Sequence, residues 1–163
     1  MAVVASGSVS NAEDAVMDTL AALSAVQTFF GVETEELARA KLINDEVPTG
    51  TARPFATCYM DPDGGGFDTE SDGFGVWHQR GEVRVLFERE VPEAYESNVA
   101  QAELDVKNHA GAIIDALIGV AGDGGEINAT RVRMFGPWRF DDNWEESALG
   151  QIQVFGLLID WVS

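Results

Sequence analysis

The longest stretch with an unbroken helical pattern of apolar and polar residues runs from Ala94 to Val120. Apolar residues recur there in steps of three and four, which places them on one face of a helix, while most charged residues fall on the other faces. We therefore predict an amphipathic helix that buries one stripe of side chains. The predicted stripe consists of Tyr95, Val99, Ala102, Val106, Ala110, Ile113, Leu117 and Val120.

A second helix is predicted near the N-terminus. Ser10 is followed by Glu13 in a capping-box pattern, and apolar residues then recur at helical spacing until Gly31. The expected order is a flexible arm (1–9), one helix (10–30), one or two further helical turns (33–43) and a connector rich in turn-forming residues (44–54).

Four further segments have the patterns of β-strands. Val83, Val85 and Phe87 alternate with charged residues, which is typical of a half-buried strand. The last segment is apolar at most positions, which indicates a central place in a sheet, and Gly156 predicts a β-bulge within it. Its expected inward-facing residues are Ile152, Val154, Leu157, Ile159 and Trp161. The predicted strands are Phe55 to Met60, Glu82 to Glu88, Ile127 to Phe135 and Gln151 to Val162.

A long amphipathic helix needs a flat apolar partner, so these elements predict a helix packed on a sheet. The chain has 163 residues, which is the length of one ordinary domain with its own core. Cys58 lies in a predicted strand and is expected to be a small core residue, since a single cysteine cannot form an internal disulfide.

The stretch from Asp61 to Gly75 combines five acidic residues with five glycines. We predict a hairpin loop without regular structure, which only a partner would order. Its acidic residues are Asp61, Asp63, Asp68, Glu70 and Asp72. An alternative is a small calcium-dependent or carbohydrate-binding module, because clustered carboxylates can bind calcium. The spacing departs from that of an EF-hand, with Gly65 and Asp72 at two ligand positions, so the loop is predicted to be metal-free.

The charge balance narrows the classes of partner. Twenty-eight acidic and ten basic residues give a formal net charge of −18, which disfavours specific nucleic-acid binding because the phosphate backbone would be repelled. The sequence has neither an apolar run of membrane-spanning length nor the basic start and apolar core of a signal peptide in its first ten residues. We therefore expect no membrane partner and synthesis in the cytoplasm.

No motif for catalysis is found. His78 and His109 belong to no metal-binding spacing, and His109 is expected to be a hydrogen-bonded residue at the boundary of the helix's apolar stripe. Nucleophile-elbow and phosphate-loop patterns do not occur. A hydrolase remains an alternative that would have only scattered acidic residues to use. The prediction is therefore no catalytic, cofactor-binding or metal-binding residue, no cofactor and no enzymatic activity.

The order of the elements supplies a resemblance. A helix, a connector, the P-F-A-T-C-Y strand, an acidic hairpin, the G-E-V-R-V-L-F-E strand and a long helix precede I-N-A-T-R-V-R-M-F and Q-I-Q-V-F-G-L-L-I-D-W-V. This order is similar to that of phage tail terminator proteins. The resemblance implies an α+β fold: a mostly antiparallel sheet of four to five strands with two main helices on one face.

The resemblance also implies a structural role in the virion. Terminators form rings, usually hexamers, that cap the tail tube, stop its polymerisation and join it to the head connector. The implied partners are further copies of the chain, the tail tube protein and the head–tail connector protein, with assembly in the host cytoplasm. The last strands place apolar groups on both faces, so a neighbouring subunit is expected to cover one of them. The candidate interface residues are Trp138, Trp144, Phe155, Leu158 and Val162.

Overall fold

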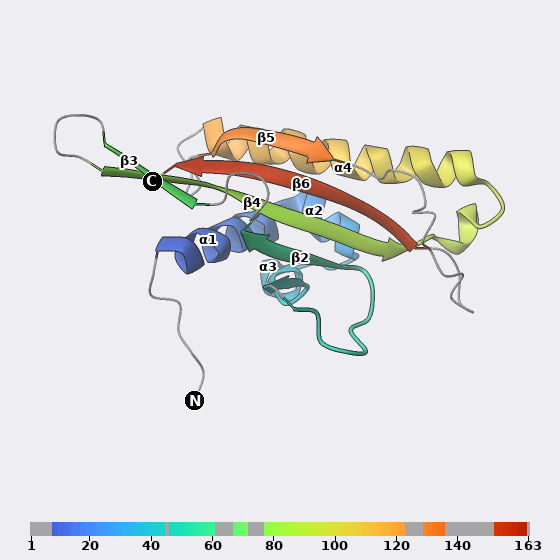
Figure 1. The fold of residues 1–163 in the computed structure, drawn as a ribbon. Coiled ribbons are helices and arrows are strands. Elements are labelled where there is room, and N and C mark those ends of the chain that lie inside the picture. The colour runs from blue at the N-terminus through green and yellow to red at the C-terminus, as the bar shows by residue number, and fades with distance from the viewer. Residues whose placement is uncertain are drawn as a thin grey trace.

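The computed structural model describes residues 8–44, 46–60, 67–71, 77–122, 129–135 and 152–162, in which a sheet carries helices on one face (Figure 1). The helices are α1 (Ser8–Ala22), α2 (Ser24–Phe30), α3 (Glu35–Arg39), the 3-10 helix η1 (Glu93–Tyr95) and α4 (Val99–Gly122). The strands are β1 (Leu42–Asn44), β2 (Phe55–Met60), β3 (Phe67–Ser71), β4 (Trp77–Glu90), β5 (Ala129–Phe135) and β6 (Ile152–Val162).

The strand order is β1-β2-β4-β6-β5, and β3 pairs with β4 outside this path. Only the β1–β2 pair is parallel among the described pairs. The predicted α+β class with a mostly antiparallel sheet is confirmed, and β6 has the expected central place between β4 and β5. The described sheet has six strands rather than four or five, because β1 and β3 were not predicted as strands.

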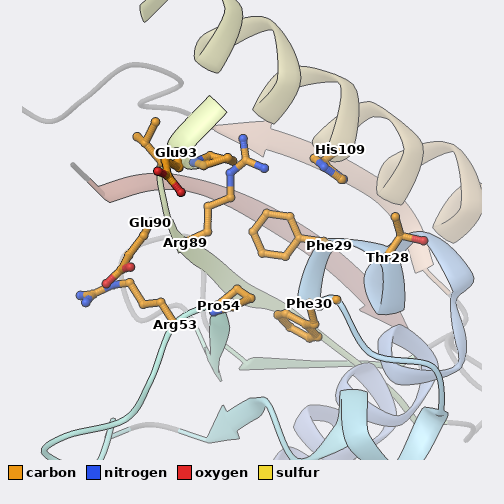
Figure 2. Close-up of a pocket in the computed structure, with 12 residues that line it drawn as sticks. Thr28, Phe29, Phe30, Arg53, Pro54, Arg89, Glu90, Glu93 and His109 are labelled. Atoms are coloured by element: carbon orange, nitrogen blue, oxygen red, sulfur yellow. The ribbon is translucent and has the colours of Figure 1, made fainter. Parts of the chain in front are cut away.

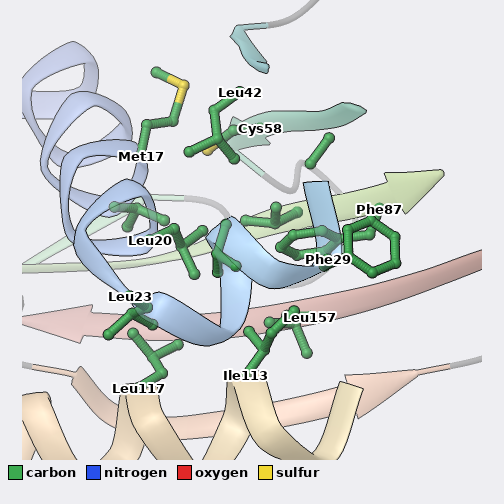
Figure 3. Packing of buried hydrophobic residues seen from close by; sticks show 14 of the residues in the cluster. Met17, Leu20, Leu23, Phe29, Leu42, Cys58, Phe87, Ile113, Leu117 and Leu157 are labelled. Carbon is green, nitrogen blue, oxygen red and sulfur yellow. The ribbon is translucent and has the colours of Figure 1, made fainter. Parts of the chain in front are cut away.

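The core lies between the sheet and helices α1, α2 and α4 (Figure 3). Phe87 of β4 lies directly opposite Phe155 of β6, and their stacked rings have centroids 4.9 Å apart. The neighbouring register pair, Val85 and Leu157, is equally buried. Cys58, opposite Val85 on β2, belongs to the same cluster, so its predicted place in the core is confirmed.

Helix α4 buries the predicted stripe over most of its length. Ala102, Val106, Ala110, Ile113 and Leu117 are fully buried. The N-terminal part of the prediction is wrong. The helix begins at Val99 rather than Ala94, Tyr95 lies in η1, and Val99 is 49% exposed. Val99 lies on the same face of the helix as the buried stripe. It belongs to the first turn, however, which extends beyond the core. Among the described residues, none of the helices combines the length and apolar character needed to cross a membrane.

The predicted N-terminal helix is divided in two. Helix α1 begins at Ser8, so the last two residues of the expected arm are helical and Ser10 is not the cap. Residues 1–7 lie outside the described ranges. Leu23 has an extended backbone (φ −76°, ψ 124°), which interrupts the helix before α2 while its side chain stays buried. Gly31 ends α2 as predicted, in the left-handed conformation (φ 66°) that glycine adopts without strain.

Part of the acidic stretch is a regular strand. Phe67 pairs with Gly81 and Ser71 with Trp77, so β3 and the first residues of β4 form an antiparallel hairpin. The prediction that residues 61–75 contain no regular element is therefore wrong for β3. Its cause is the greater length of β4, which extends N-terminally from the predicted start at Glu82 and offers β3 a backbone partner. The rest of the stretch, residues 61–66 and 72–75, lies outside the described ranges.

The predicted bulge in β6 is also wrong. Gly156 is paired without a register shift to Leu86 on one side and Phe135 on the other, and the irregularity lies between Ala129 and Arg131 of β5. The inward residues of β6 are Gln153, Phe155, Leu157 and Ile159, whereas Ile152 and Val154 are only half-buried. Inward and outward residues alternate regularly along β6. Because the inward position 153 carries the amide of Gln153 rather than an apolar side chain, the sequence did not show which residues face inward.

Candidate functional site

A buried polar network joins the two central strands to α4. Arg89 of β4 donates hydrogen bonds from Nε and Nη2 to Gln153 Oε1 of β6, at 3.0 and 2.8 Å. Nη2 also donates to Asp105 Oδ2 of α4 at 2.7 Å. Gln153 Nε2 in turn donates to the carbonyl oxygen of Ala102 at 2.8 Å. The guanidinium is thus paired with a carboxylate and an amide, as a charge that is 7% exposed requires.

The strand period places this network at the end of the apolar core. Phe87 and Phe155 face the helices, so Arg89, two residues after Phe87, and Gln153, two residues before Phe155, face the same way. Phe29 of α2 separates the two regions: its ring contacts Phe155 at 5.4 Å between centroids, and the Arg89 guanidinium lies 6.0 Å from the centroid of its ring.

His109 lies on α4 one turn after Asp105. Its Nε2 is 3.7 Å from Asp105 Oδ2, and its ring meets Phe29 edge-on at 5.6 Å. Burial lowers the pKa of His109 below 6.5, and the charge of Arg89 lowers the pKa further, while Asp105 acts in the opposite direction. His109 is therefore neutral at pH 7. Its half-buried position at the edge of the core agrees with the predicted boundary role.

A pocket of about 490 Å³ opens beside this network (Figure 2). Its walls come from the end of α2, the start of β2, the end of β4, η1 and α4. Arg53 lies 5.6 Å over the ring of Phe55 and 3.7 Å from Glu88, and its Nε is buried without a hydrogen-bond partner within the described part of the chain. The lining residues are Thr28, Phe29, Phe30, Gly31, Arg53, Pro54, Arg89, Glu90, Val91, Pro92, Glu93 and His109.

The pocket combines charged and apolar groups. Arg53 and Arg89 lie beside an apolar wall of Phe29 and Phe30, and each guanidinium already has a carboxylate partner, Glu88 for Arg53 and Asp105 for Arg89. Within the described ranges, no group of three or more histidine, cysteine, aspartate or glutamate residues is arranged to hold a metal ion.

The second face of the sheet carries none of the described helices (Figure 1). Leu86 of β4 and Val154 and Leu158 of β6 lie on this face and are half-buried. They alternate with the buried residues of the same strands, Leu158 opposite Arg84 and Val154 opposite Glu88. This open sheet face mixes apolar and charged groups, which is the composition of many protein interfaces.

The predicted interface residues do not lie on one surface of the described structure. Phe155 is fully buried in the core between sheet and helices, so we remove it from the candidate interface. Leu158 lies on the open sheet face, and Val162 is the last residue of β6, in register with Arg80. Trp138 and Trp144 lie outside the described ranges.

The predicted acidic loop is only partly described. Asp68 and Glu70 belong to β3, in register with Arg80 and His78. The other three acids, Asp61, Asp63 and Asp72, lie outside the described ranges. Sequence reasoning missed the pocket and its network altogether. A signal was present: Val83, Val85 and Phe87 face inward, and Arg89 continues that alternating series.

Comparison with protein-family models gives no match for this sequence, and comparison with curated proteins gives none either. A proposal about function must therefore be argued from the fold and from the two surfaces just described, the open sheet face and the pocket. These surfaces lie on different parts of the sheet, since the pocket is formed at the ends of β2 and β4.

Proposed function

We propose that this protein is a structural component of a phage tail. In this proposal, copies of the chain form a ring, hexameric as in tail terminators, that caps the tail tube, stops its polymerisation and joins it to the head connector. The order of elements supports it: an N-terminal helical region, a Pro54-preceded strand, a hairpin, a long helix and two closing strands follow one another as in that family.

The observation that carries the proposal is the one-sided helix cover of the sheet. Leu86, Val154 and Leu158 stay half-buried on the open sheet face although the same strands bury their alternate residues completely. Transfer of apolar surface out of water contributes about 25 cal/mol per Å², so a partner that covers these side chains is favoured. A second copy of the chain is the simplest partner because it is always present at assembly.

A closed ring requires two different surfaces on each copy. One surface meets the other on the next copy, and the assembly closes when the rotation between neighbours completes a circle. The described sheet ends at β1 on one edge and β5 on the other, so its two edges differ in strand length and neighbouring helices. A contact that joins one edge to the other edge of the next copy is heterologous.

The charge of the chain is consistent with a ring around DNA. A net charge of −18 keeps a lumen from binding the DNA that passes through it. The same charge makes copies repel one another, so assembly should be easier at higher ionic strength, where exposed charges are screened within about 10 Å.

The test of this function is a tube-capping assay. The chain is added to polymerising tail tube protein, and tube lengths are measured by negative-stain electron microscopy. We expect shorter tubes with a ring of density at one end. Leu158→Asp on the open sheet face should abolish capping, whereas the control Leu104→Asp, at a site 52% exposed on α4, should not. Tubes of unchanged length with the wild-type chain would refute the function.

A further inference from the structure

Helix α4 leaves apolar side chains uncovered on the side that faces away from the sheet. Of the four large apolar side chains that are exposed among the described residues, three belong to α4: Val99, Leu104 and Ile118. Leu104 and Ile118 are 52% and 53% exposed. A side chain built at Gly111 or Gly119 would have open space around it, with no atom of another element within 4 Å. Within the described ranges, this side of α4 is therefore not covered by another element.

Three positions on this side of α4 lie in one line. Leu104, Gly111 and Ile118 follow one another at intervals of seven residues, which is close to two turns of an α-helix. The side chains at a contact set the distance between two packed helices, so a glycine between two large apolar residues lets another helix approach closely. We call Leu104, Lys107, Gly111, Asp115 and Ile118 the outer stripe of α4.

The outer stripe is neutral in a strongly acidic chain. Among the exposed residues from Val99 to Gly119, only Lys107 and Asp115 are charged, whereas the chain has a net charge of −18. Lys107 pairs with Glu103 on its own helix at 2.6 Å, but an exposed pair of this kind contributes little, and the ammonium group has three donors. Two copies can therefore meet at this stripe without a local excess of negative charge.

The outer stripe is also symmetric about Gly111. Lys107 precedes Gly111 by four residues and Asp115 follows it by four, while Leu104 precedes it by seven and Ile118 follows it by seven. In two antiparallel helices related by a twofold axis at Gly111, residues equally far from the axis in opposite directions come to the same level. Lys107 of each copy then reaches the level of Asp115 of the other, and Leu104 reaches that of Ile118. Opposite charges and apolar groups are matched twice, as a self-complementary contact requires.

We propose that the outer stripe of α4 is a twofold contact between two copies of this chain, with the axis at Gly111. The open sheet face lies on the other side of the sheet from α4, so a copy held by this contact keeps that face free. The contact is therefore independent of the proposed ring. One helix face is smaller than a standard protein interface, so the pair forms at high protein concentration.

Disulfide trapping of the full chain tests the position of the axis. Gly111→Cys places the two introduced thiols opposite each other, and mild oxidation should link the two copies. Gly119→Cys is the matched control, because this position is equally open but lies eight residues from Gly111, about 12 Å from the axis. Cys58 is buried and common to both variants. A disulfide needs Cα atoms within about 7 Å of each other, so we expect at least about tenfold more linked dimer from Gly111→Cys. Equal yields would overturn the proposed axis.

Sedimentation equilibrium up to millimolar concentration tests the contact itself. The full chain carries Leu158→Asp in this experiment, which removes the contact at the open sheet face, and we expect a species of twice the 17.6 kDa chain mass. Adding Leu104→Asp should raise the dissociation constant about tenfold or more, because each pair loses this apolar group twice. Leu37→Asp is the matched control, at a site 53% exposed on α3, and should leave the dissociation constant unchanged.

Charge exchange tests the antiparallel match. Lys107→Glu should raise the dissociation constant about fivefold or more, because it places a second acid at the level of Asp115 in both halves of the pair. Adding Asp115→Lys to Lys107→Glu should restore the wild-type value, since the two charges are then exchanged. Circular dichroism should show that every variant is folded.

The outcomes separate this contact from the proposed function. A chain that stays at 17.6 kDa up to millimolar concentration, or a dimer that is indifferent to Leu104→Asp, would leave the outer stripe to another kind of partner and overturn the contact. Neither result changes the capping of tail tubes by the wild-type chain. Conversely, a chain that does not cap tubes but forms the dimer trapped at Gly111→Cys supports the contact and overturns the function.

Discussion

Arg89 and Gln153 lie directly opposite each other on β4 and β6, and the guanidinium donates two hydrogen bonds, of 3.0 and 2.8 Å, to the single side-chain oxygen of the glutamine. The amide nitrogen of Gln153 continues the connection to the backbone of α4 at Ala102. One amide therefore ties the two central strands to the long helix. Arg89 also lines the pocket, so this network both clamps the two strands to the helix and forms part of the pocket wall.

Replacing Gln153 with leucine tests the clamp. The substitution leaves Arg89 Nε without its acceptor and removes the side-chain donor to the Ala102 carbonyl, and each lost partner of a buried polar group costs about 1–3 kcal/mol. We expect the free energy of unfolding to fall by about 2–5 kcal/mol, measured by urea denaturation. Gln101→Leu, on the exposed surface of α4, is the control and should change stability by less than about 0.5 kcal/mol. Equal effects of the two substitutions would contradict a role for the network.

Ile113 tests the packing of α4 on the sheet. It is fully buried, and truncation to alanine removes buried methyl groups and leaves a cavity, at a cost of roughly 2–5 kcal/mol. Ile118→Ala is the matched control, because Ile118 lies on the same helix but is 53% exposed. Thermal unfolding should separate the two variants clearly, and a wild-type melting temperature for Ile113→Ala would show that the helix is misplaced.

His109 makes stability depend on pH. Its pKa is lowered in the folded state, mainly by burial, so below pH 6.5 the unfolded chain binds more protons at this site than the folded chain does. The stability that the neutral imidazole contributes is therefore present above pH 6.5 and is lost as the pH falls from 6.5 toward the lowered folded pKa. We compare the wild type with His109→Gln, in which His78 is retained. As the pH falls, the free energy of unfolding of the wild type should decrease more than that of His109→Gln. A difference between the two that stays constant from pH 7.5 to 5 would refute the lowered pKa of His109.

The acidic hairpin is predicted to bind no calcium at micromolar concentrations. The spacing of its acids departs from that of an EF-hand. Isothermal titration of the full chain with calcium should give no saturable heat in that range. Micromolar binding that is abolished by Asp63→Asn with Asp68→Asn would instead favour a calcium-dependent module.

Several elements could be predicted because their patterns are long and regular. Val106, Ile113 and Leu117 repeat with the helical period over several turns, and Val83, Val85 and Phe87 alternate without interruption, so burial follows directly from spacing. The α+β class with a mostly antiparallel sheet came instead from the resemblance in element order, and the strand pairing agrees with it.

The pocket could not be predicted because it depends on tertiary contacts. Arg89 and Gln153 are polar residues at buried positions, and those positions are tolerated because the two side chains bond to each other, to Asp105 and to the Ala102 carbonyl. Phe155 was assigned to an interface because the sequence does not state which face of β6 the helices cover. The interruption at Leu23 has no glycine or proline to mark it; the residue turns because its side chain packs into the core.

The mass of the protein in solution tests the proposed ring most directly. Size-exclusion chromatography with multi-angle light scattering, run from low to high salt, measures that mass independently of shape. We expect a discrete species of six times the 17.6 kDa chain mass whose fraction grows with ionic strength and protein concentration. A single peak at 17.6 kDa under every condition would contradict the ring.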